Sequence, residues 1–400
     1  YTPAVLLLAF VVWIFSNNIE LAITVLVLGC PGALVIGVPV SNVSGIGNGA
    51  RNGVLLKGSE VIGDFSKVDS ILFDKTGTLT LGNPTVAETI HYAGDHGETL
   101  RYLASVERES DHPLAKAVSQ RIGEVDHLPV SRTDVVKGGG IVAEVQEHRV
   151  AVGNASLMER ENVALNENVK ADIERFASEG NSIVLTAVDG ELRTLMGVRD
   201  QIRPGVKKQL EELRKLGVKN LVILSGDNQG TVDAVAKELG MTQAYGNMLP
   251  EDKSHFVKRM KEEGQTVAFV GDGVNDSPSL ALADVGIAMG TGTDVAIETS
   301  DVVLINSDLD RLPHSLGLTK AISRNMKQNI VIAVGVVLIL FAGLFLGDWV
   351  NMSIGMLVHE ASILVVILNG MRLIGYRQRK GTHNRFRLSR SLEITGERRK

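Results

Sequence analysis

Apolar residues gather at the two ends of the chain and thin out between them. Four stretches consist almost entirely of apolar residues, at 6–15, 21–40, 330–346 and 352–373. All but the first are long enough, or nearly so, to cross about 30 Å of hydrocarbon. We therefore predict four membrane-spanning helices, one pair at 1–48 and one pair at 321–375, with the first helix cut short at its start.

Short polar segments at 16–18 and 347–349 join the helices within each pair. Each pair is therefore expected to form a hairpin, which leaves the central block and both chain ends on one side of the membrane. Basic residues mark that side: Arg51, Lys57, Lys67, Arg324, Lys327, Arg372, Arg377, Arg379 and Lys380. Because Lys and Arg accumulate in cytoplasmic loops, we expect an integral protein of the plasma membrane with cytoplasmic catalytic domains and a basic cytoplasmic tail at 376–400.

The central block has the alternation of an α/β protein. Three apolar runs, at 70–73, 220–224 and 266–270, each end in acidic or polar residues, and helical stretches such as Pro204 to Leu216 separate them. This order predicts repeated βαβ units and a parallel sheet. Ligands of open α/β sheets bind at the carboxyl ends of the strands, so the polar residues after these runs are expected to meet at one edge.

The first of these runs is followed by Asp-Lys-Thr-Gly-Thr-Leu-Thr at positions 74–80. Asp74 is thus placed at the tip of a buried strand, ahead of small and hydroxyl residues that can hold phosphate oxygens. We interpret it as a nucleophile that accepts a phosphoryl group. Phosphoryl transfer also requires a divalent cation and a cationic side chain at the phosphate. Asp272, in Gly-Asp-Gly, is a candidate Mg²⁺ ligand, and Lys253 is the candidate phosphate clamp.

Alone, a Gly-Asp-Gly or Ser-Gly-Asp sequence is most often a turn, but the combination resembles the haloacid dehalogenase-like phosphorylation domain of the P-type ATPases. The resemblance implies an α/β phosphorylation domain in two parts, 49–82 and 199–320, beside α-helical membrane segments. It implies these roles: Asp74, Lys75, Thr76, Asp227, Lys253, Asn275 and Asp276 are catalytic, and Asp74, Thr76 and Asp272 hold Mg²⁺. Ser225 stands where the family usually has threonine, and this exchange keeps the hydroxyl group.

An inserted segment at 83–198 has the size of a small domain. Its Glu107, His112, Gly138, Gly140 and Asn154 are individually compatible with turns, although glycines would also let a nucleotide approach the backbone. Together they resemble the nucleotide-binding set of the heavy-metal branch of the P-type ATPases. The resemblance implies an inserted α+β nucleotide-binding domain in which these residues hold the adenosine part of ATP.

A candidate transport site lies in the membrane segments. Cys30-Pro31-Gly32 interrupts the second apolar stretch, where proline kinks a helix and frees a backbone carbonyl. Cys30 is the only cysteine, so an internal disulfide is excluded, although a buried thiol can also be a simple small hydrophobe. The Cys-Pro pair resembles the ion-binding kink of the heavy-metal branch. Gly32 stands where many members have a second cysteine, which disfavours a two-thiolate Cu⁺ site.

His359-Glu360 in the last apolar stretch supplies the other candidate ligands, because ionisable residues inside a membrane are functional by default. Cys30, His359 and Glu360 together suit Zn²⁺, Cd²⁺ or Co²⁺, and Fe²⁺ or Mn²⁺ remains an alternative. The pair resembles the His-Glu motif of cobalt-type members, with Ala361 in place of a glycine. A structural alternative for His359 is a hydrogen bond between helices.

We therefore expect ATP-driven export of a divalent heavy metal, with ATP and Mg²⁺ as cofactors and the metal ion and the lipid bilayer as partners. The net charge of -5 says little about partners, but the lack of a basic stripe with interleaved aromatic residues argues against a nucleic-acid partner. A dehalogenase-type phosphatase and an inactive membrane fragment are the alternatives. The resemblance also implies an actuator domain and further helices before Tyr1, and hence a C-terminal portion, since the only Thr-Gly-Glu lies in the tail at 395–397.

Overall fold

The computed structural model describes residues 2–30, 32–110, 112–136, 138–290, 292–347 and 350–377. The chain forms two units, of which the first comprises Tyr1–Asn48 and Arg324–Lys400 and the second Gly49–Ser323. Pro31, Asp348, Trp349 and the tail from 378 onward, including the Thr-Gly-Glu at 395–397, lie outside the described residues. The predictions made for them are not addressed by the structure.

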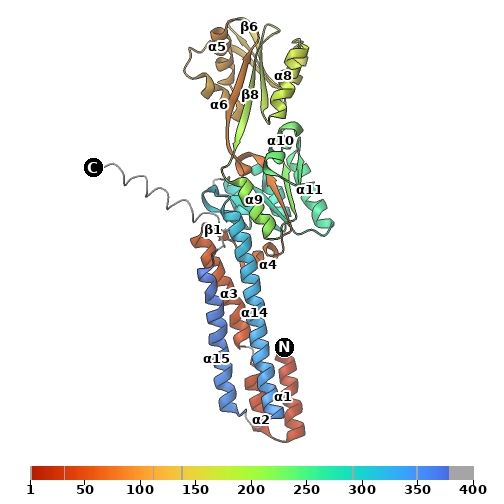
Figure 1. Cartoon of the computed structure of the whole chain (residues 1–400), viewed down its shortest axis with the longest axis vertical. Coiled ribbons are helices and arrows are strands. Elements are labelled where there is room, and N and C mark those ends of the chain that lie inside the picture. The colour runs from red at the N-terminus through yellow and green to blue at the C-terminus, as the bar shows by residue number, and fades with distance from the viewer. Residues whose placement is uncertain are drawn as a thin grey trace, which may run out of the picture. The chain divides into compact units, whose positions relative to one another are not determined.

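Helices build the first unit (Figure 1). They are α1 (Thr2–Ser16), α2 (Ile19–Leu28), α3 (Gly32–Arg51), α14 (Arg311–Leu346) and α15 (Met352–Met371), where α3 and α14 run on into the second unit. Three spans are long and apolar enough to cross a membrane, Ile19–Arg51, Arg311–Leu346 and Met352–Gly375. The fourth predicted span, expected to be cut short at its start, corresponds to the shorter apolar helix α1. It has 15 residues, or about 22 Å at 1.5 Å per residue, so its crossing of the membrane stays a prediction.

The predicted interruption of the second apolar stretch is present. Helix α2 ends at Leu28, where Gly29 donates its N–H to the carbonyl oxygen of Val25 at 2.9 Å, and α3 starts only at Gly32. Cys30 therefore lies between two helices. The site of this break is where the sequence places its proline.

A cluster of buried amide and hydroxyl groups joins α3, α14 and α15. Ser41 donates to Asn325 Oδ1 at 2.8 Å, Asn329 donates to the carbonyl of Gly37 at 3.1 Å, and Asn369 donates to Asn329 Oδ1 at 2.8 Å. Hydrogen bonds between helices satisfy polar groups that hydrocarbon cannot. This network fixes the three helices against one another at that level.

The second unit contains a seven-stranded sheet in the order β1-β13-β12-β11-β2-β9-β10. Its strands are β1 (Val54–Leu56), β2 (Ser70–Asp74), β9 (Asn220–Leu224), β10 (Gln243–Tyr245), β11 (Val267–Gly271), β12 (Val285–Met289) and β13 (Val302–Leu304). All neighbours are parallel except β1 and β13. The predicted parallel sheet is confirmed, and β2 lies between β11 and β9.

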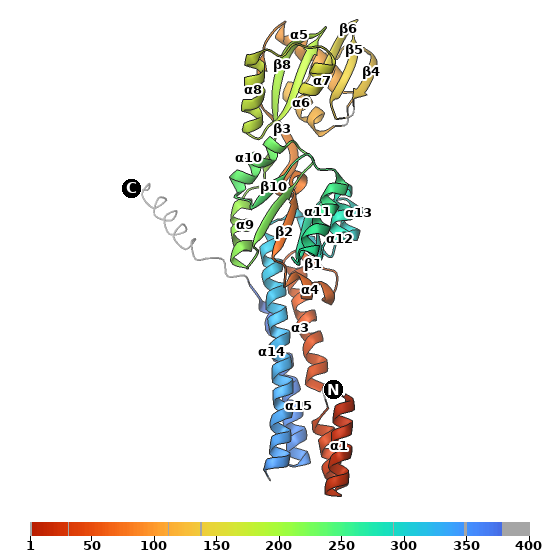
Figure 2. The ribbon, with the colours of Figure 1, turned by 90° about the vertical axis from the view of Figure 1, so that its right-hand side faces the viewer.

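Helices cover both faces of this sheet (Figure 2). They are α4 (Ser59–Phe65), α9 (Val206–Lys215), α10 (Gln229–Leu239), α11 (Pro250–Glu262), α12 (Ser277–Leu282) and α13 (Asp294–Thr299). In Figure 2, α9 and α10 lie on one side of the strands and α11 to α13 on the other. Strand β2 is buried along its whole length, as expected for the continuous apolar run of a central parallel strand.

A second sheet of six antiparallel strands has the order β3-β8-β7-β6-β5-β4. Its elements are β3 (Thr80–His91), α5 (His96–Glu107), α6 (Pro113–Ile122), β4 (Val130–Val136), β5 (Gly140–Val145), β6 (His148–Gly153), α7 (Ala155–Arg160), α8 (Glu167–Ser178), β7 (Ser182–Val188) and β8 (Glu191–Ile202). One core lies under α5 and α6 and another under α7 and α8. Strands β3 and β8 continue through the predicted boundaries at 83 and 198, so the inserted sheet extends from Thr80 to Ile202.

Candidate functional site

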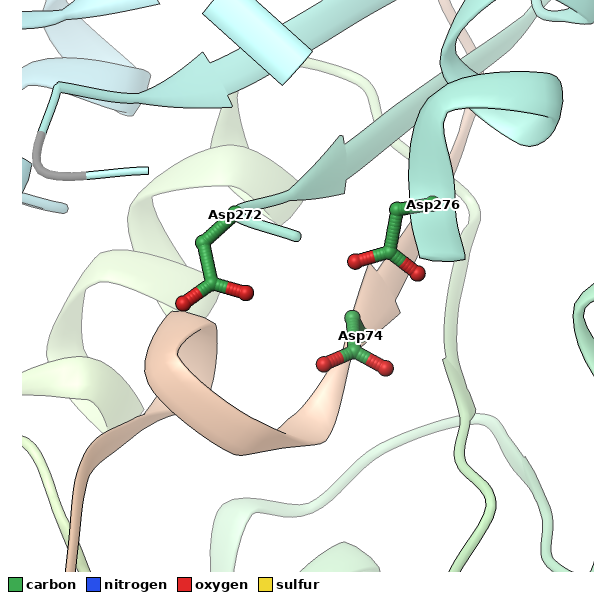
Figure 3. Close-up of side chains that lie close together, drawn as sticks. All are labelled: Asp74, Asp272 and Asp276. Atoms are coloured by element: carbon green, nitrogen blue, oxygen red, sulfur yellow. The ribbon is translucent and has the colours of Figure 1, made fainter. Parts of the chain in front are cut away.

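The sheet edge predicted to carry the chemistry contains three carboxylates. Asp74 ends β2, Asp272 follows β11, and Asp276 lies in the short helical turn after it (Figure 3). One oxygen from each carboxylate lies within 4.8 Å of the others. Hard carboxylate oxygens at this spacing suit Mg²⁺. The predicted meeting of Asp74 and Asp272 is therefore present in the structure, and Asp276 joins them.

Lys253, near the start of α11, lies among these carboxylates. Its buried ammonium donates to Asp74 Oδ1 and, at 2.9 Å, to Asp276 Oδ1. Asp276 thereby holds the ammonium beside the nucleophile. Helix α11 begins at Pro250, and its Asp252 side chain accepts from the N–H of Leu249 at 2.9 Å, which fixes the first turn that carries Lys253.

Burial and charge change the acidity of this cluster. Burial raises the pKa of Asp74 to about 7, the negative charge of Asp276 adds to the rise, and Lys253 opposes it. Burial also raises the pKa of Asp272 to about 6, again with a contribution from Asp276. Burial lowers the pKa of Lys253, but Asp74 and Asp276 outweigh it, so that the net shift is upward. A divalent cation would relieve the crowding of negative charge here.

The loop after Asp74 is held from two sides. The buried Lys75 forms an ion pair with the partly exposed Asp227, and the guanidinium of Arg203 donates to the carbonyl of Gly77 at 2.6 Å. Ser225 Oγ accepts from the N–H of Asp227 at 3.2 Å, so the hydroxyl in the place of the family's threonine orders the loop that carries Asp227. The other two catalytic residues predicted, Thr76 and Asn275, have exposed side chains.

All five predicted nucleotide-binding residues line one cavity of about 460 Å³. Asn154 donates to the carbonyl of Gly138 at 2.8 Å, and His112 Nδ1 accepts from the N–H of Leu114 at 3.2 Å. A Cβ at Gly140 would lie 2.2 Å from the carbonyl oxygen of Val152, so only glycine allows the two strands to approach here. Burial raises the pKa of Glu107 to about 7.

The remaining walls of this cavity are apolar, with Val135, Val136, Ile141, Val152, Ile183 and Val184 among them. Cavities that bind small molecules combine apolar walls with a few placed polar groups. The sequence pattern indicated the polar residues and glycines but not these walls. They come from β4, β5, β6 and β7, which only the antiparallel pairing of the sheet brings together.

In the membrane unit, Cys30 and His359 line a small cavity between the helices, together with Ser362. A Cβ at Gly32 would lie 3.2 Å from His359 Nε2. The imidazole therefore lies where a side chain at position 32 would begin. His359 is buried, and its Nδ1 has no hydrogen-bond partner among the described residues. Glu360 is exposed and does not line this cavity, so the structure does not bring the third predicted ligand to it.

The model of the haloacid dehalogenase-like hydrolases matches residues 68–284. A zinc-transporting ATPase of Bacillus subtilis (strain 168) is 40% identical over 369 residues, which are 90% of this chain and 57% of that protein. The solved catalytic domain of the CPx-ATPase CopB-B is 34% identical with a TM-score of 0.53, and the match covers 97% of that chain and 68% of this one. The chain belongs to the heavy-metal P-type ATPases.

Other members of the family extend this comparison. A copper-exporting P-type ATPase of Staphylococcus haemolyticus (strain JCSC1435) is 38% identical over 83% of this chain and 42% of that protein. A crystal structure of a zinc-transporting PIB-type ATPase in the E2.Pi state matches with a TM-score of 0.77 at 33% identity, over 94% of this chain and 62% of that one. The chain therefore spans about half the length of the curated relatives that it matches.

As a heavy-metal P-type ATPase, the chain is an integral membrane protein with a haloacid dehalogenase-like domain, as predicted. The segment 200–204 resembles the hinge of the family in sequence, but the contact of its Arg203 with the loop after Asp74 was not indicated by the sequence pattern. Arg203 follows β8, and it also donates to the carbonyl of Ser307 at 3.3 Å. A single arginine after a strand carries no sequence signal of its own, since an exposed cation is the usual outcome.

Proposed function

We propose that this ATPase exports a divalent heavy-metal cation, most specifically Zn²⁺, through a phosphorylated Asp74. The observation that carries the proposal is the position of Lys253, whose ammonium contacts Asp74 while Asp276 holds it there. A nucleophilic carboxylate beside a fixed cation at a strand tip is the arrangement that phosphoryl transfer requires. We place the protein in the plasma membrane, with the second unit in the cytoplasm.

ATP would enter the cavity lined by Glu107, His112 and Asn154, with its base against the apolar walls. An oxygen of Asp74 attacks the γ-phosphorus of ATP. The bond from that phosphorus to the β,γ-bridging oxygen breaks, and ADP leaves. Lys253 stabilises the negative charge on the transferred group. Asp74 and Asp272 together with Thr76 would hold Mg²⁺, which supplies charge neutralisation at the phosphate. Water later attacks the phosphorus of this acyl phosphate, and the bond to the Asp74 oxygen breaks, which releases phosphate and restores the carboxylate.

The membrane unit supports the choice of a divalent metal. The relatives include zinc-transporting and copper-exporting proteins, so the family alone leaves both metals open. Here one thiol and one imidazole line the cavity, and the imidazole lies in close contact with the place where a side chain at position 32 would begin. Thiolate with imidazole suits Zn²⁺, Cd²⁺ or Co²⁺, whereas Cu⁺ favours soft thiolates. Fe²⁺ and Mn²⁺ remain alternatives, and Glu360 is a ligand to be tested on its own.

The test uses membranes that contain the complete protein, labelled ATP and a panel of Zn²⁺, Cd²⁺, Co²⁺, Fe²⁺, Mn²⁺ and Cu⁺. We expect acid-stable phosphoenzyme that depends on one of the divalent metals, is lost in Asp74→Asn and loses its metal dependence in Cys30→Ser. Labelling stimulated only by Cu⁺ would overturn the choice of metal. Labelling that never depends on metal would overturn the transport site and favour a phosphatase of the dehalogenase class.

A further inference from the structure

A groove with three cationic side chains opens between α14 and α15 in the membrane unit. It has a volume of about 430 Å³, and Arg324, Lys327 and Arg372 line it. The three are exposed. Within the described part of the chain, none of them forms an ion pair with Asp or Glu, and no acidic residue lines the groove. Like charges gathered in this way repel one another, and an anion between them would offset the repulsion.

The other end of the groove is apolar. Val331 and Ile332 line it one turn further along α14, at the start of a stretch, 330–346, that has no charged residue. Helix α15 runs back along α14 and reaches Arg372 at its end. The cations of both helices therefore lie where the apolar spans meet water, and the apolar part of the groove extends into the span.

We propose that this groove binds an anionic phospholipid of the cytoplasmic leaflet, with the headgroup phosphate on Arg324, Lys327 and Arg372 and an acyl chain on Val331 and Ile332. Basic pockets between helices on the cytoplasmic side suit anionic headgroups, and the apolar part distinguishes a lipid from a soluble anion. Free phosphate would match only the cationic half of the groove, and a zwitterionic lipid would bring a positive group to the same cations.

Lipid binding would also act indirectly on α3, the helix that follows Cys30. Arg372 donates to Asn369 Oδ1 at 2.9 Å, Asn369 donates to Asn329 Oδ1 at 2.8 Å, and Asn329 donates to the carbonyl of Gly37 in α3 at 3.1 Å. A headgroup that fixes Arg372 therefore also favours the observed arrangement of this chain of hydrogen bonds. Binding is expected to stabilise the packing of α3 against α14 and α15.

The test compares phosphatidylglycerol with phosphatidylcholine of the same acyl chains, added to the complete protein in detergent, and counts retained lipids by native mass spectrometry. The triple variant R324Q/K327Q/R372Q removes the cations. The matched control, K207Q/K208Q/K215Q, removes three exposed cations of α9. We expect wild type and control to retain phosphatidylglycerol at least about tenfold better than the triple variant, since each cation contributes about a factor of five.

Equal retention of the two lipids, or equal retention by wild type and the triple variant, would overturn the proposal. Displacement of phosphatidylglycerol by millimolar glycerol phosphate would also overturn it, in favour of a soluble anion. The variant R324K/R372K keeps all three charges and should still bind phosphatidylglycerol. Loss of binding in R324Q/K327Q/R372Q together with binding in R324K/R372K would show that charge, and not misfolding, is responsible. Lipid retention is measured without ATP or metal. The lipid proposal can therefore be overturned while metal export is upheld, and metal export can be overturned while lipid binding is upheld.

Discussion

Asp272 occupies the space that a side chain at Gly77 would need. Gly77 has a φ of +73°, and a Cβ built on it would lie 1.8 Å from Asp272 Oδ2. The loop after the nucleophile and the loop after β11 therefore touch directly, and glycine is required for both the backbone conformation and the contact. This contact sets the distance between Asp272 and Asp74 on the catalytic edge.

Gly77→Ala should lower phosphorylation of Asp74 by at least about a hundredfold, because the displaced Asp272 no longer shares an ion with Asp74. The left-handed conformation alone costs an alanine about 1–2 kcal/mol. Gly190→Ala is the matched control, since Gly190 has a φ of +81° and nothing within 4 Å of the added Cβ. Phosphoenzyme yield of the complete protein measures both. Equal losses in the two variants would show that backbone strain, and not the contact with Asp272, is responsible.

Lys253→Gln should lower the rate of phosphoenzyme formation by about 10²–10³, because it removes the cation that contacts Asp74. The variant also leaves Asp276 without its ammonium partner, so the second unit should unfold at lower temperature. Rapid-quench labelling and thermal unfolding measure the two effects.

Lys258→Gln on the same helix is the control. Its side chain is 65% exposed, and its ammonium lies 3.9 Å from Glu262, so the loss of this charge should change stability by less than about 1 kcal/mol. Substantial phosphorylation in Lys253→Gln would remove Lys253 from the catalytic role.

The ionisation of Glu107 should lower the free energy of unfolding of the six-stranded antiparallel sheet and its helices as pH rises. An unfolded Glu titrates near 4.5, whereas burial raises the folded pKa to about 7. Between these values the folded state binds more protons than the unfolded state, so stability falls through this range and levels off above pH 7. The difference corresponds to about 3 kcal/mol. Glu107→Gln should remove this loss, and the gain should be largest near pH 8 and small near pH 5.

Amide hydrogen exchange in α5 of the complete protein, corrected for intrinsic rates, measures the local opening free energy at each pH. Glu109→Gln is the control, because Glu109 lines the same cavity but is exposed. Its effect should stay within about 0.5 kcal/mol at all pH values. A Glu107→Gln profile parallel to that of wild type would show that the carboxyl is not desolvated.

Strand positions could be predicted from the sequence because each central strand is an apolar run that ends in polar residues. Parallel pairing then brings Asp74 and Asp272 to one edge without further information. The contact of Arg203 with Gly77 could not be predicted, since it spans 126 residues of sequence. The role of Asp276 is also clearer in the structure, where it positions Lys253.

Predictions in the membrane were weaker for two physical reasons. Hydropathy indicates which segments are apolar but not where each helix begins and ends, and α1, with 15 residues, is apolar yet shorter than the other spans. His359 and Glu360 were grouped because they are adjacent in sequence. Neighbours on a helix point about 100° apart, and only His359 faces the cavity of Cys30.

The contact between Gly32 and His359 makes metal choice testable by a single substitution. A Cβ at position 32 would lie 3.0 Å from Ile363 Cδ1 and 3.2 Å from His359 Nε2. Gly32→Cys should therefore displace the imidazole and supply a second thiolate beside Cys30. We expect Zn²⁺-dependent phosphorylation to fall by at least about tenfold and Cu⁺-dependent phosphorylation to appear, because two thiolates favour Cu⁺.

Gly32→Ala separates displacement of the His359 imidazole from metal binding by a new thiolate, since it adds the same Cβ without sulfur. It should lose the response to Zn²⁺ as Gly32→Cys does, yet gain no response to Cu⁺. Both variants are compared with His359→Ala, which should also lose the Zn²⁺ response, and with Glu360→Gln, which should keep it because Glu360 is exposed. A full Zn²⁺ response in Gly32→Ala and His359→Ala would show that the imidazole beside Gly32 is not a metal ligand, and a lost response in Glu360→Gln would assign that role to the carboxylate.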